Sequence, residues 1–144
     1  MLGFYRMELS ETQKGKLEQA AKKHGLTLVL LFGSRADGGV HAESDWDVAV
    51  QMKGFDWMKY SELTWDIAEA LGVPSERLDL SSVDIADPLF LKKISDTSVV
   101  LYGDSRAYQG FLLKAFHRYE DYKPFLAQEA QAVGRYVRQY AYAH

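Results

Sequence analysis

Two short motifs, a Gly-Ser pair and an Asp-x-Asp triplet, carry the side chains of this 144-residue chain that could do chemistry together. Asp45 and Asp47 are two residues apart, so on a β-strand their carboxylates project from one face, with Cα atoms about 6.5 Å apart. Two like charges this close repel each other unless a cation lies between them. Carboxylate oxygens suit Mg²⁺, which completes its shell with water and substrate phosphate. The triplet therefore predicts a magnesium site.

Gly33 and Ser34 follow a buried apolar stretch directly, at a point where the chain must turn. Glycine permits positive φ and close approach of the backbone to a ligand. Free amides in such a turn, together with the Ser34 hydroxyl, can bind a phosphate group. An anion site next to a cation site is what a triphosphate bridged by Mg²⁺ requires. Taken separately, the two motifs are equally consistent with an ordinary loop and a pair of solvated surface acids.

A third carboxylate would complete a two-metal centre, and Asp79 is the best candidate. In a predicted strand over 77–81, Asp79 faces away from Leu78 and Leu80. A charged side chain between two leucines in a strand needs a partner or a metal ion. Arg35 follows the Gly-Ser pair, where it could contact phosphate or be an ordinary surface arginine.

The other elements predicted by the sequence would position these motifs. Ser10 and Gln13 form a capping box for a helix that ends at Gly25. The nearly continuous apolar run over 26–32 is typical of a central strand buried on both faces. The remaining predicted elements are strands at 45–51, 77–81 and 98–102, and helices at 56–71 and from 87 to about 95. This order indicates an α/β (α+β) fold with a small mixed β-sheet flanked by helices.

The C-terminal part has a helical pattern from residue 104 onward. Pro124 should break or kink it, because proline lacks the amide and clashes with the preceding turn, and a second helix is expected at about 125–140. We expect one domain over 1–144, with a core at about 10–103 and a C-terminal helical segment at about 104–144. Trp57 and Trp65 are predicted to be packing residues rather than residues that stack on bases. The Tyr- and Arg-rich end at 135–142 is predicted to help dock a partner.

Composition excludes several classes of function. The absence of cysteine excludes disulfides, thiolate catalysis and cysteine-ligated zinc. With 17 Lys and Arg against 20 Asp and Glu, the net charge of −3 argues against a direct nucleic-acid binder. No signal-peptide pattern begins the chain, and no apolar run is long enough to cross a bilayer. The expected location is the cytoplasm, without a membrane partner.

The two motifs together resemble a known signature. The sequence Gly33-Ser34-Arg35-Ala36, with ten residues between Ser34 and the following Asp45-Trp46-Asp47-Val48, is similar to that of the DNA polymerase β-type nucleotidyltransferase superfamily. The whole chain resembles its minimal, MNT-type branch over about residues 10–125. Proteins of that branch serve as antitoxins paired with HEPN-domain ribonuclease toxins.

The resemblance implies a polymerase-β-like fold and a role for each motif. Asp45 and Asp47 would bind two Mg²⁺ ions, with Asp79 as the third acid, and Gly33 and Ser34 would hold the terminal phosphates of ATP. The implied reaction transfers AMP from ATP to a hydroxyl of the cognate HEPN toxin, a tyrosine, releases pyrophosphate and neutralises the toxin.

Two other functions stay open at the level of sequence. The chain could be a non-catalytic antitoxin that acts by binding the toxin alone. It could also be a small-molecule nucleotidyltransferase of the aminoglycoside type. Larger relatives carry an extra domain that binds their acceptor. This chain has no room for one, which favours an acceptor delivered by a partner protein.

Overall fold

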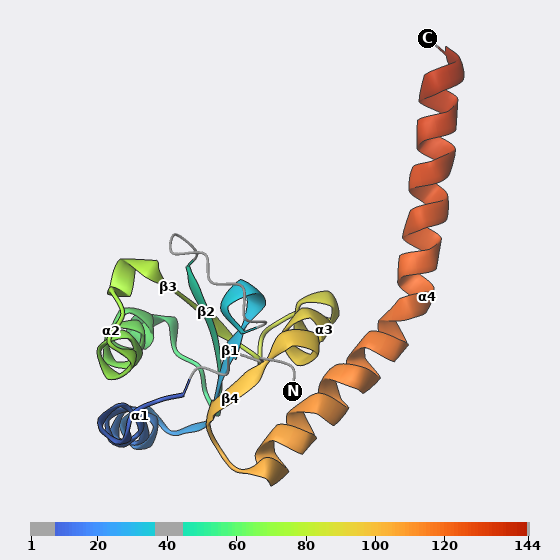
Figure 1. Ribbon diagram of the computed structural model, residues 1–144. Helices are drawn as coiled ribbons and strands as arrows, with labels where there is room; N and C mark the ends of the chain where they lie inside the picture. The colour runs from blue at the N-terminus through green and yellow to red at the C-terminus, as the bar shows by residue number, and fades with distance from the viewer. Residues whose placement is uncertain (1–7, 37–44, 144) are drawn as a thin grey trace, which may run out of the picture.

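A four-stranded mixed sheet with helices on both faces forms the body of the protein (Figure 1). The computed structural model describes residues 8–36 and 45–143, so most of the loop predicted over 33–44 lies outside the described residues. Its helices and strands are α1 Glu11–His24, β1 Leu26–Phe32, β2 Trp46–Met52, α2 Tyr60–Leu71, β3 Leu78–Ser82, α3 Pro88–Thr97, β4 Val99–Tyr102 and α4 Ser105–Ala143. Short 3₁₀ turns are η1 Gly33–Arg35, η2 Trp57–Lys59 and η3 Ser75–Arg77. The predicted fold class is confirmed.

The strand order β3-β2-β1-β4 places β1 inside the sheet. β1 pairs antiparallel with β2 and β4, whereas β2 and β3 run parallel. Every residue of β1 except Thr27 is buried, as the apolar run predicts for a strand covered on both faces.

Two apolar layers cover the sheet. On one face, α1 and α2 pack against alternate strand residues; this layer includes Leu17, Ala21, Val29, Leu31, Val48, Val50, Leu63, Ile67, Leu78 and Leu80. On the other face lie α3 and the first part of α4; that layer includes Leu28, Leu30, Phe32, Ala49, Val83, Leu91, Ile94, Phe111 and Ala115. Figure 1 shows the two pairs of helices on opposite sides of the strands.

Both predicted ends of α1 and the predicted start of α3 are confirmed. The Ser10 hydroxyl accepts a hydrogen bond from the Gln13 amide at 3.2 Å, and the Gln13 side chain accepts one from the Ser10 amide at 2.8 Å. Gly25 ends α1 in the left-handed conformation, with φ 67°. Asp87 caps α3 by accepting from the Phe90 amide at 2.8 Å. α3 extends two residues beyond the predicted end at 95, to Thr97.

Of the predicted break or kink at Pro124, the structure has the kink (Figure 1): α4 continues through Pro124 as one helix, so the separate second helix expected at about 125–140 is not formed. Proline removes one intrahelical hydrogen bond and crowds the preceding turn, a cost that a helix relieves by bending. Figure 1 shows α4 changing direction about midway along its length, where Pro124 lies. Pro124 and Glu120 are both exposed, so water can satisfy the carbonyl that loses its partner.

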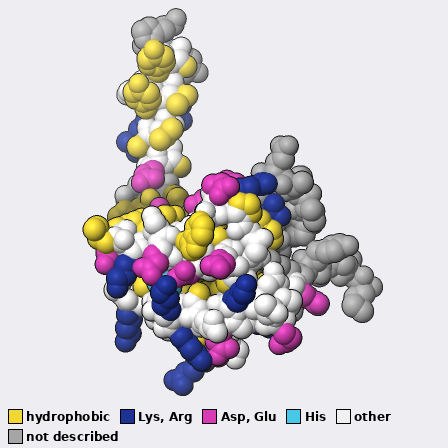
Figure 2. All heavy atoms as spheres, turned by 90° about the vertical axis from the view of Figure 1, so that its left-hand side faces the viewer, with side chains coloured by type: hydrophobic (Ala, Val, Ile, Leu, Met, Phe, Trp, Pro, Cys, Tyr) yellow, Lys and Arg dark blue, Asp and Glu magenta, His cyan; other side chains and the backbone are white. Residues whose placement is uncertain are grey.

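Several large apolar side chains are exposed. Trp57 and Trp65, predicted as packing residues, have 67% and 61% of their surface accessible and so contribute little to the core, although the Trp57 ring packs edge-to-face on Phe55 with 4.9 Å between centroids. The C-terminal half of α4 projects beyond the sheet, and Figure 2 shows hydrophobic side chains gathered along it. Val133, Tyr136 and Tyr140 there are each at least 60% exposed. No helix within the described residues combines the length and apolar character needed to cross a membrane.

Candidate active site

The ends of three strands bring the two motifs together. Gly33 follows the last residue of β1, while Asp47 and Asp79 are each the second residue of β2 and β3. The register pairs Phe32 with Asp47 across the antiparallel ladder and Asp47 with Asp79 across the parallel one. Neighbouring strands lie about 4.8 Å apart. The two carboxylates and the Gly-Ser turn therefore meet at one end of the sheet.

The alternation of side chains along a strand places these carboxylates on one face. Val48 and Leu80, one residue further along, belong to the layer under α1 and α2. Asp47 and Asp79 therefore project on the opposite face, toward α3. Asp45 shares this alternation but lies one residue before β2 rather than within it, and its side chain is exposed. The structure thus brings Asp47 and Asp79 side by side, with Asp45 at the adjoining exposed end.

Electrostatics disfavours a full set of negative charges at this end of the sheet. Burial raises the pKa of the half-buried Asp47 above its ordinary value, the negative charge of Asp79 raises it further, and that of Asp45 adds to the effect. The positive charge of Lys93 on α3 opposes them. A cation relieves the repulsion between adjacent carboxylates, and an all-oxygen donor set fits Mg²⁺.

Gly33 is required by the close packing at the turn. Its φ is +77°, and a Cβ built at this position would overlap the Asp47 carboxylate. The Gly33 amide donates a hydrogen bond to the Thr97 hydroxyl at 3.2 Å. That amide, expected from sequence to be free for a phosphate, therefore ties the turn to α3. The Ala36 amide also donates within the turn, to the Gly33 carbonyl at 3.1 Å. The Ser34 hydroxyl and amide therefore stay the expected donors to a phosphate at this turn.

Arg35 completes the η1 turn and contacts an aromatic ring. Its guanidinium carbon lies 4.2 Å from the centre of the Trp46 ring, a cation–π arrangement. Trp46 packs against the layer of α1 and α2, so this contact draws the Arg35 side chain toward that layer. Asp47 and Asp79 project from the other face of the sheet.

Sequence reasoning missed two residues of α3 at this site, Lys93 and Thr97. They are four residues apart and so share a face of the helix. The spacing itself was visible in the sequence. Which face of α3 would turn toward Gly33 depended on the packing of α3 against β1, for which no local signal exists.

A second acidic cluster lies at the other end of the sheet. His24, Glu62 and Asp66 place one potential ligand atom each within 4.8 Å of one another. β1 begins two residues after His24 and spans about 20 Å before reaching Gly33, so this cluster is remote from Asp47. The Lys23 amine bridges the two acids, at 2.9 Å from Glu62 and 3.0 Å from Asp66. This bridging lysine gives the cluster a positive charge of its own, paired with both acids.

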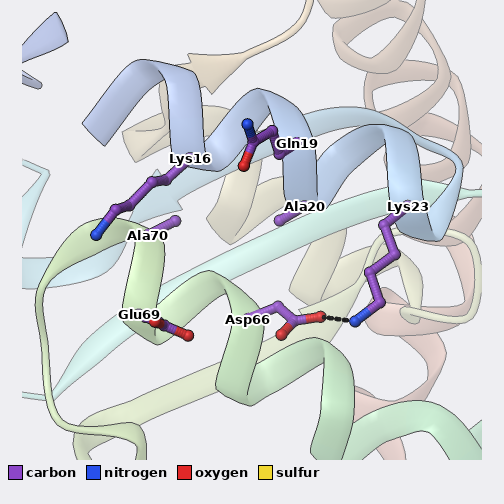
Figure 3. Close-up of a pocket in the computed structure, with 7 residues that line it drawn as sticks. All are labelled: Lys16, Gln19, Ala20, Lys23, Asp66, Glu69 and Ala70. Atoms are coloured by element: carbon purple, nitrogen blue, oxygen red, sulfur yellow. Dashed lines mark hydrogen bonds and ion pairs between the residues drawn. The ribbon is translucent and has the colours of Figure 1, made fainter. Parts of the chain in front are cut away.

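A cavity of about 250 Å³ lies beside the same cluster, between α1 and α2 (Figure 3). Lys16 and Gln19 on α1 and Glu69 on α2 line it, together with Lys23 and Asp66, which are joined by a hydrogen bond. α1 and α2 cover the face of the sheet opposite to the Asp47 and Asp79 side chains. The sheet therefore separates this cavity from the candidate active site.

Comparison with known protein families gives one match. The family described as "Polymerase beta, Nucleotidyltransferase" matches residues 15–107, which include both motifs, all four strands and α3. No curated protein matches the chain.

Solved structures with the same fold include chains of toxin–antitoxin complexes. A toxin–antitoxin with AMP-PNP is 26% identical, covering 87% of this chain and 98% of that chain, with a TM-score of 0.66. An MntA–HepT toxin–antitoxin is 23% identical over 90% and 99%, with a TM-score of 0.62. A complex of tri-AMPylated Shewanella oneidensis HEPN toxin with MNT antitoxin is 23% identical over 88% and 96%, with a TM-score of 0.61.

The family match confirms the resemblance to polymerase β-type nucleotidyltransferases that the two motifs indicate, and the solved structures share the fold. The matched region begins within α1 and ends within the first turn of α4, so it contains every strand end that contributes to the candidate site. The chain belongs to the polymerase beta nucleotidyltransferase family.

Proposed function

We propose that this protein is a magnesium-dependent nucleotidyltransferase antitoxin that transfers AMP from ATP to a tyrosine hydroxyl of a HEPN-domain toxin. The observation that carries the proposal is the pairing of Asp47 with Asp79 on neighbouring strands, directly beside the Gly33 turn. Family membership supports the reaction class. A related antitoxin chain occurs in a complex with a tri-AMPylated HEPN toxin, which supports the acceptor.

In the proposed reaction the acceptor oxygen attacks the α-phosphorus of ATP. A new oxygen–phosphorus bond forms, the bond from the α-phosphorus to the leaving oxygen breaks, and pyrophosphate departs. Two Mg²⁺ ions, held by Asp45, Asp47 and Asp79, would supply positive charge to the phosphate oxygens in such a reaction. Asp79 is exposed and accepts the proton that the acceptor hydroxyl loses.

The turn at Gly33, Ser34 and Arg35 is proposed to bind the terminal phosphates of the nucleotide. Gly33 lets the backbone pass against the Asp47 carboxylate, so this turn and the carboxylates adjoin. A phosphate held here would extend from the turn toward the acidic residues, with the α-phosphate nearest to them. The nucleotide is thereby oriented by the turn at one end of its polyphosphate tail.

The exposed face of the C-terminal half of α4 is proposed as the surface that binds the toxin. Leu126, Ala130, Val133, Val137 and Tyr140 recur at alternating spacings of four and three, which line one side of a helix. Most of the stability of a helix in a protein comes from packing of its apolar face, so a partner that covers the stripe would also stabilise this part of α4. The exposed stripe favours a protein acceptor over an aminoglycoside-type small molecule.

The reaction is tested by incubating the protein and its cognate toxin with Mg²⁺ and ATP labelled on the α-phosphate. We expect label on the toxin and a gain of AMP mass on a tyrosine. Asp45→Asn combined with Asp47→Asn should reduce transfer on the order of a thousandfold or more, because it removes the charge-stabilising group. Full neutralisation of the toxin by this double variant would overturn catalysis as the mechanism and support an antitoxin that acts by binding alone.

The docking surface is tested with Val133→Asp combined with Val137→Asp, which places two charges in the apolar stripe. We expect toxin binding to weaken about a hundredfold, the size of a lost hot spot, with ATP binding unchanged. Gln128→Asp combined with Gln131→Asp is the matched control, since it adds the same charges on other sides of α4. Equal toxin affinities of the two double variants in calorimetry would exclude the stripe as the docking surface.

A further inference from the structure

One stripe of α3 faces the point where β1 ends. Phe90, Lys93 and Thr97 have the spacing i, i+3 and i+7 and so lie on the same side of the helix. The Phe90 ring packs edge-to-face on Phe32, the last residue of β1, with 5.6 Å between centroids. The Thr97 hydroxyl accepts the hydrogen bond from the Gly33 amide at 3.2 Å and donates one to the Lys93 carbonyl at 3.0 Å.

Lys93 lies between these two contacts. Because the residues on either side of it along the stripe touch Phe32 and Gly33, Lys93 is held beside the Gly-Ser turn. Its positive charge acts on the Asp47 carboxylate, the ladder partner of Phe32. The Lys93 side chain is exposed, so a ligand at the turn can reach it.

The neighbouring Lys92 points elsewhere and makes other contacts. Its amine lies 3.0 Å from Asp96 and 4.9 Å from the centre of the Tyr119 ring on α4. Within the part of the chain that the structure describes, the Lys93 amine has no carboxylate inside the 4.0 Å ion-pair distance. Of two adjacent lysines, the one that faces the candidate site is therefore the one whose charge is not already paired.

We propose that Lys93 is a binding residue for the β- and γ-phosphates of the nucleotide, and so for the pyrophosphate that leaves. This inference rests on the proposed function. The amine of a lysine is a compact point charge that binds phosphate. α3 is fixed against the sheet by the buried Leu91 and Ile94, so little backbone movement is needed to present it. Lys93 thus adds a cation from α3 opposite the acids from β2 and β3.

A direct test is the affinity of the purified protein for ATP and for AMP, measured by calorimetry with Mg²⁺. AMP lacks the β- and γ-phosphates and should not sense Lys93. We expect Lys93→Gln to weaken ATP binding about tenfold, the effect of one charge-assisted hydrogen bond, and to change AMP binding by less than about twofold. Lys92→Gln removes the same charge one residue away and should leave both affinities within about twofold.

A second variant, Lys93→Arg, keeps the charge and should retain most of the ATP affinity. Equal ATP affinities for Lys93→Gln and Lys92→Gln would overturn the role of Lys93 while leaving the proposed function intact. Parallel losses of ATP and AMP binding would also overturn it, since they indicate support of the fold rather than contact with phosphate. Failure of the unsubstituted protein to bind ATP at all would reject the proposed function itself, and Lys93 binding with it.

Discussion

Two acidic clusters at opposite ends of the sheet differ in how their charges are paired. Asp66 accepts hydrogen bonds from His24 at 2.7 Å and from Lys23 at 3.0 Å. Asp47 stands beside another carboxylate, and within the described residues no hydrogen bond or ion pair holds it. The net result is opposite: the pKa of Asp66 lies below its ordinary value, and that of Asp47 lies above.

The difference separates charges that stabilise the fold from charges kept for a ligand. In the Asp66 cluster, the carboxylate joins α1 to α2 and its charge is paired with Lys23 within the protein. In the Asp47 cluster, the protein bears repulsion between carboxylates that only an added cation removes. A perturbed pKa at an accessible strand end is typical of a functional site, since a fold alone gains nothing from it.

The largest effect on stability is expected for Gly33→Ala, which disturbs the packing against Asp47. A φ of +77° disfavours a side chain, and the new Cβ would displace the carboxylate. We expect a loss of about 2–3 kcal/mol in the free energy of unfolding and a loss of nucleotide binding. Gly110→Ala is the control, since α4 is helical there and nothing lies within 4 Å of the added Cβ. A fully stable, ATP-binding Gly33→Ala variant would contradict the packing described here.

A smaller effect should separate the two clusters directly, by comparing Asp66→Asn with Asp47→Asn in urea unfolding without divalent ions. Asp66→Asn leaves His24, whose side chain is 5% exposed, without a charged partner. It should cost about 1–2 kcal/mol. Asp47→Asn relieves repulsion and should leave stability equal or higher. Losses of the same size in both variants would mean that Asp47 supports the fold as Asp66 does.

Sequence patterns within single helices and strands correctly predicted most of the secondary structure. The capping box at Ser10, the cap at Asp87 and the apolar run of β1 all depend on neighbours along the chain, and the structure has each of them. The strand assignments likewise placed Asp47 and Asp79 each in a strand. Their pairing required the parallel register of β2 with β3, which is a property of the sheet and not of either strand.

The predictions that the structure corrects concern effects that depend on surroundings beyond the local pattern. Pro124 was expected to break or kink a helix; it kinks α4 without ending it (Figure 1), because an exposed helix can bend and let water satisfy the freed carbonyl. Trp57 and Trp65 were expected to be packing residues, yet both are mostly exposed. Lys93 belongs to no sequence motif. Its position beside the site follows from the contacts of Phe90 with Phe32 and of Thr97 with Gly33, which fix the orientation of α3.

The smallest expected effect is a difference in pH dependence between the two clusters. Burial alone would raise the pKa of Asp66, but the hydrogen bonds from His24 and Lys23 outweigh it and lower the pKa below the ordinary 3.8. The stability that Asp66 contributes is therefore complete above pH 3.8 and is lost as the pH falls below it. The pKa of Asp47 is raised, so the sign is reversed. The contribution of Asp47 to the free energy of unfolding is most favourable below pH 3.8 and is lost as the pH rises through the pKa of Asp47 in the folded protein.

Urea unfolding of the protein and both variants from pH 3 to pH 7, at low salt and without divalent ions, measures the two trends. The cost of Asp66→Asn should shrink toward acid, whereas any gain from Asp47→Asn should grow toward neutral pH, each by less than about 1 kcal/mol. Adding Mg²⁺ should abolish the stability gain of Asp47→Asn and leave the cost of Asp66→Asn unchanged. A cation bound by the unsubstituted protein removes the same repulsion that the Asp47→Asn variant removes. If the stability changes of the two variants varied with pH in the same direction, or responded equally to Mg²⁺, the two clusters would not differ in how their charges are paired.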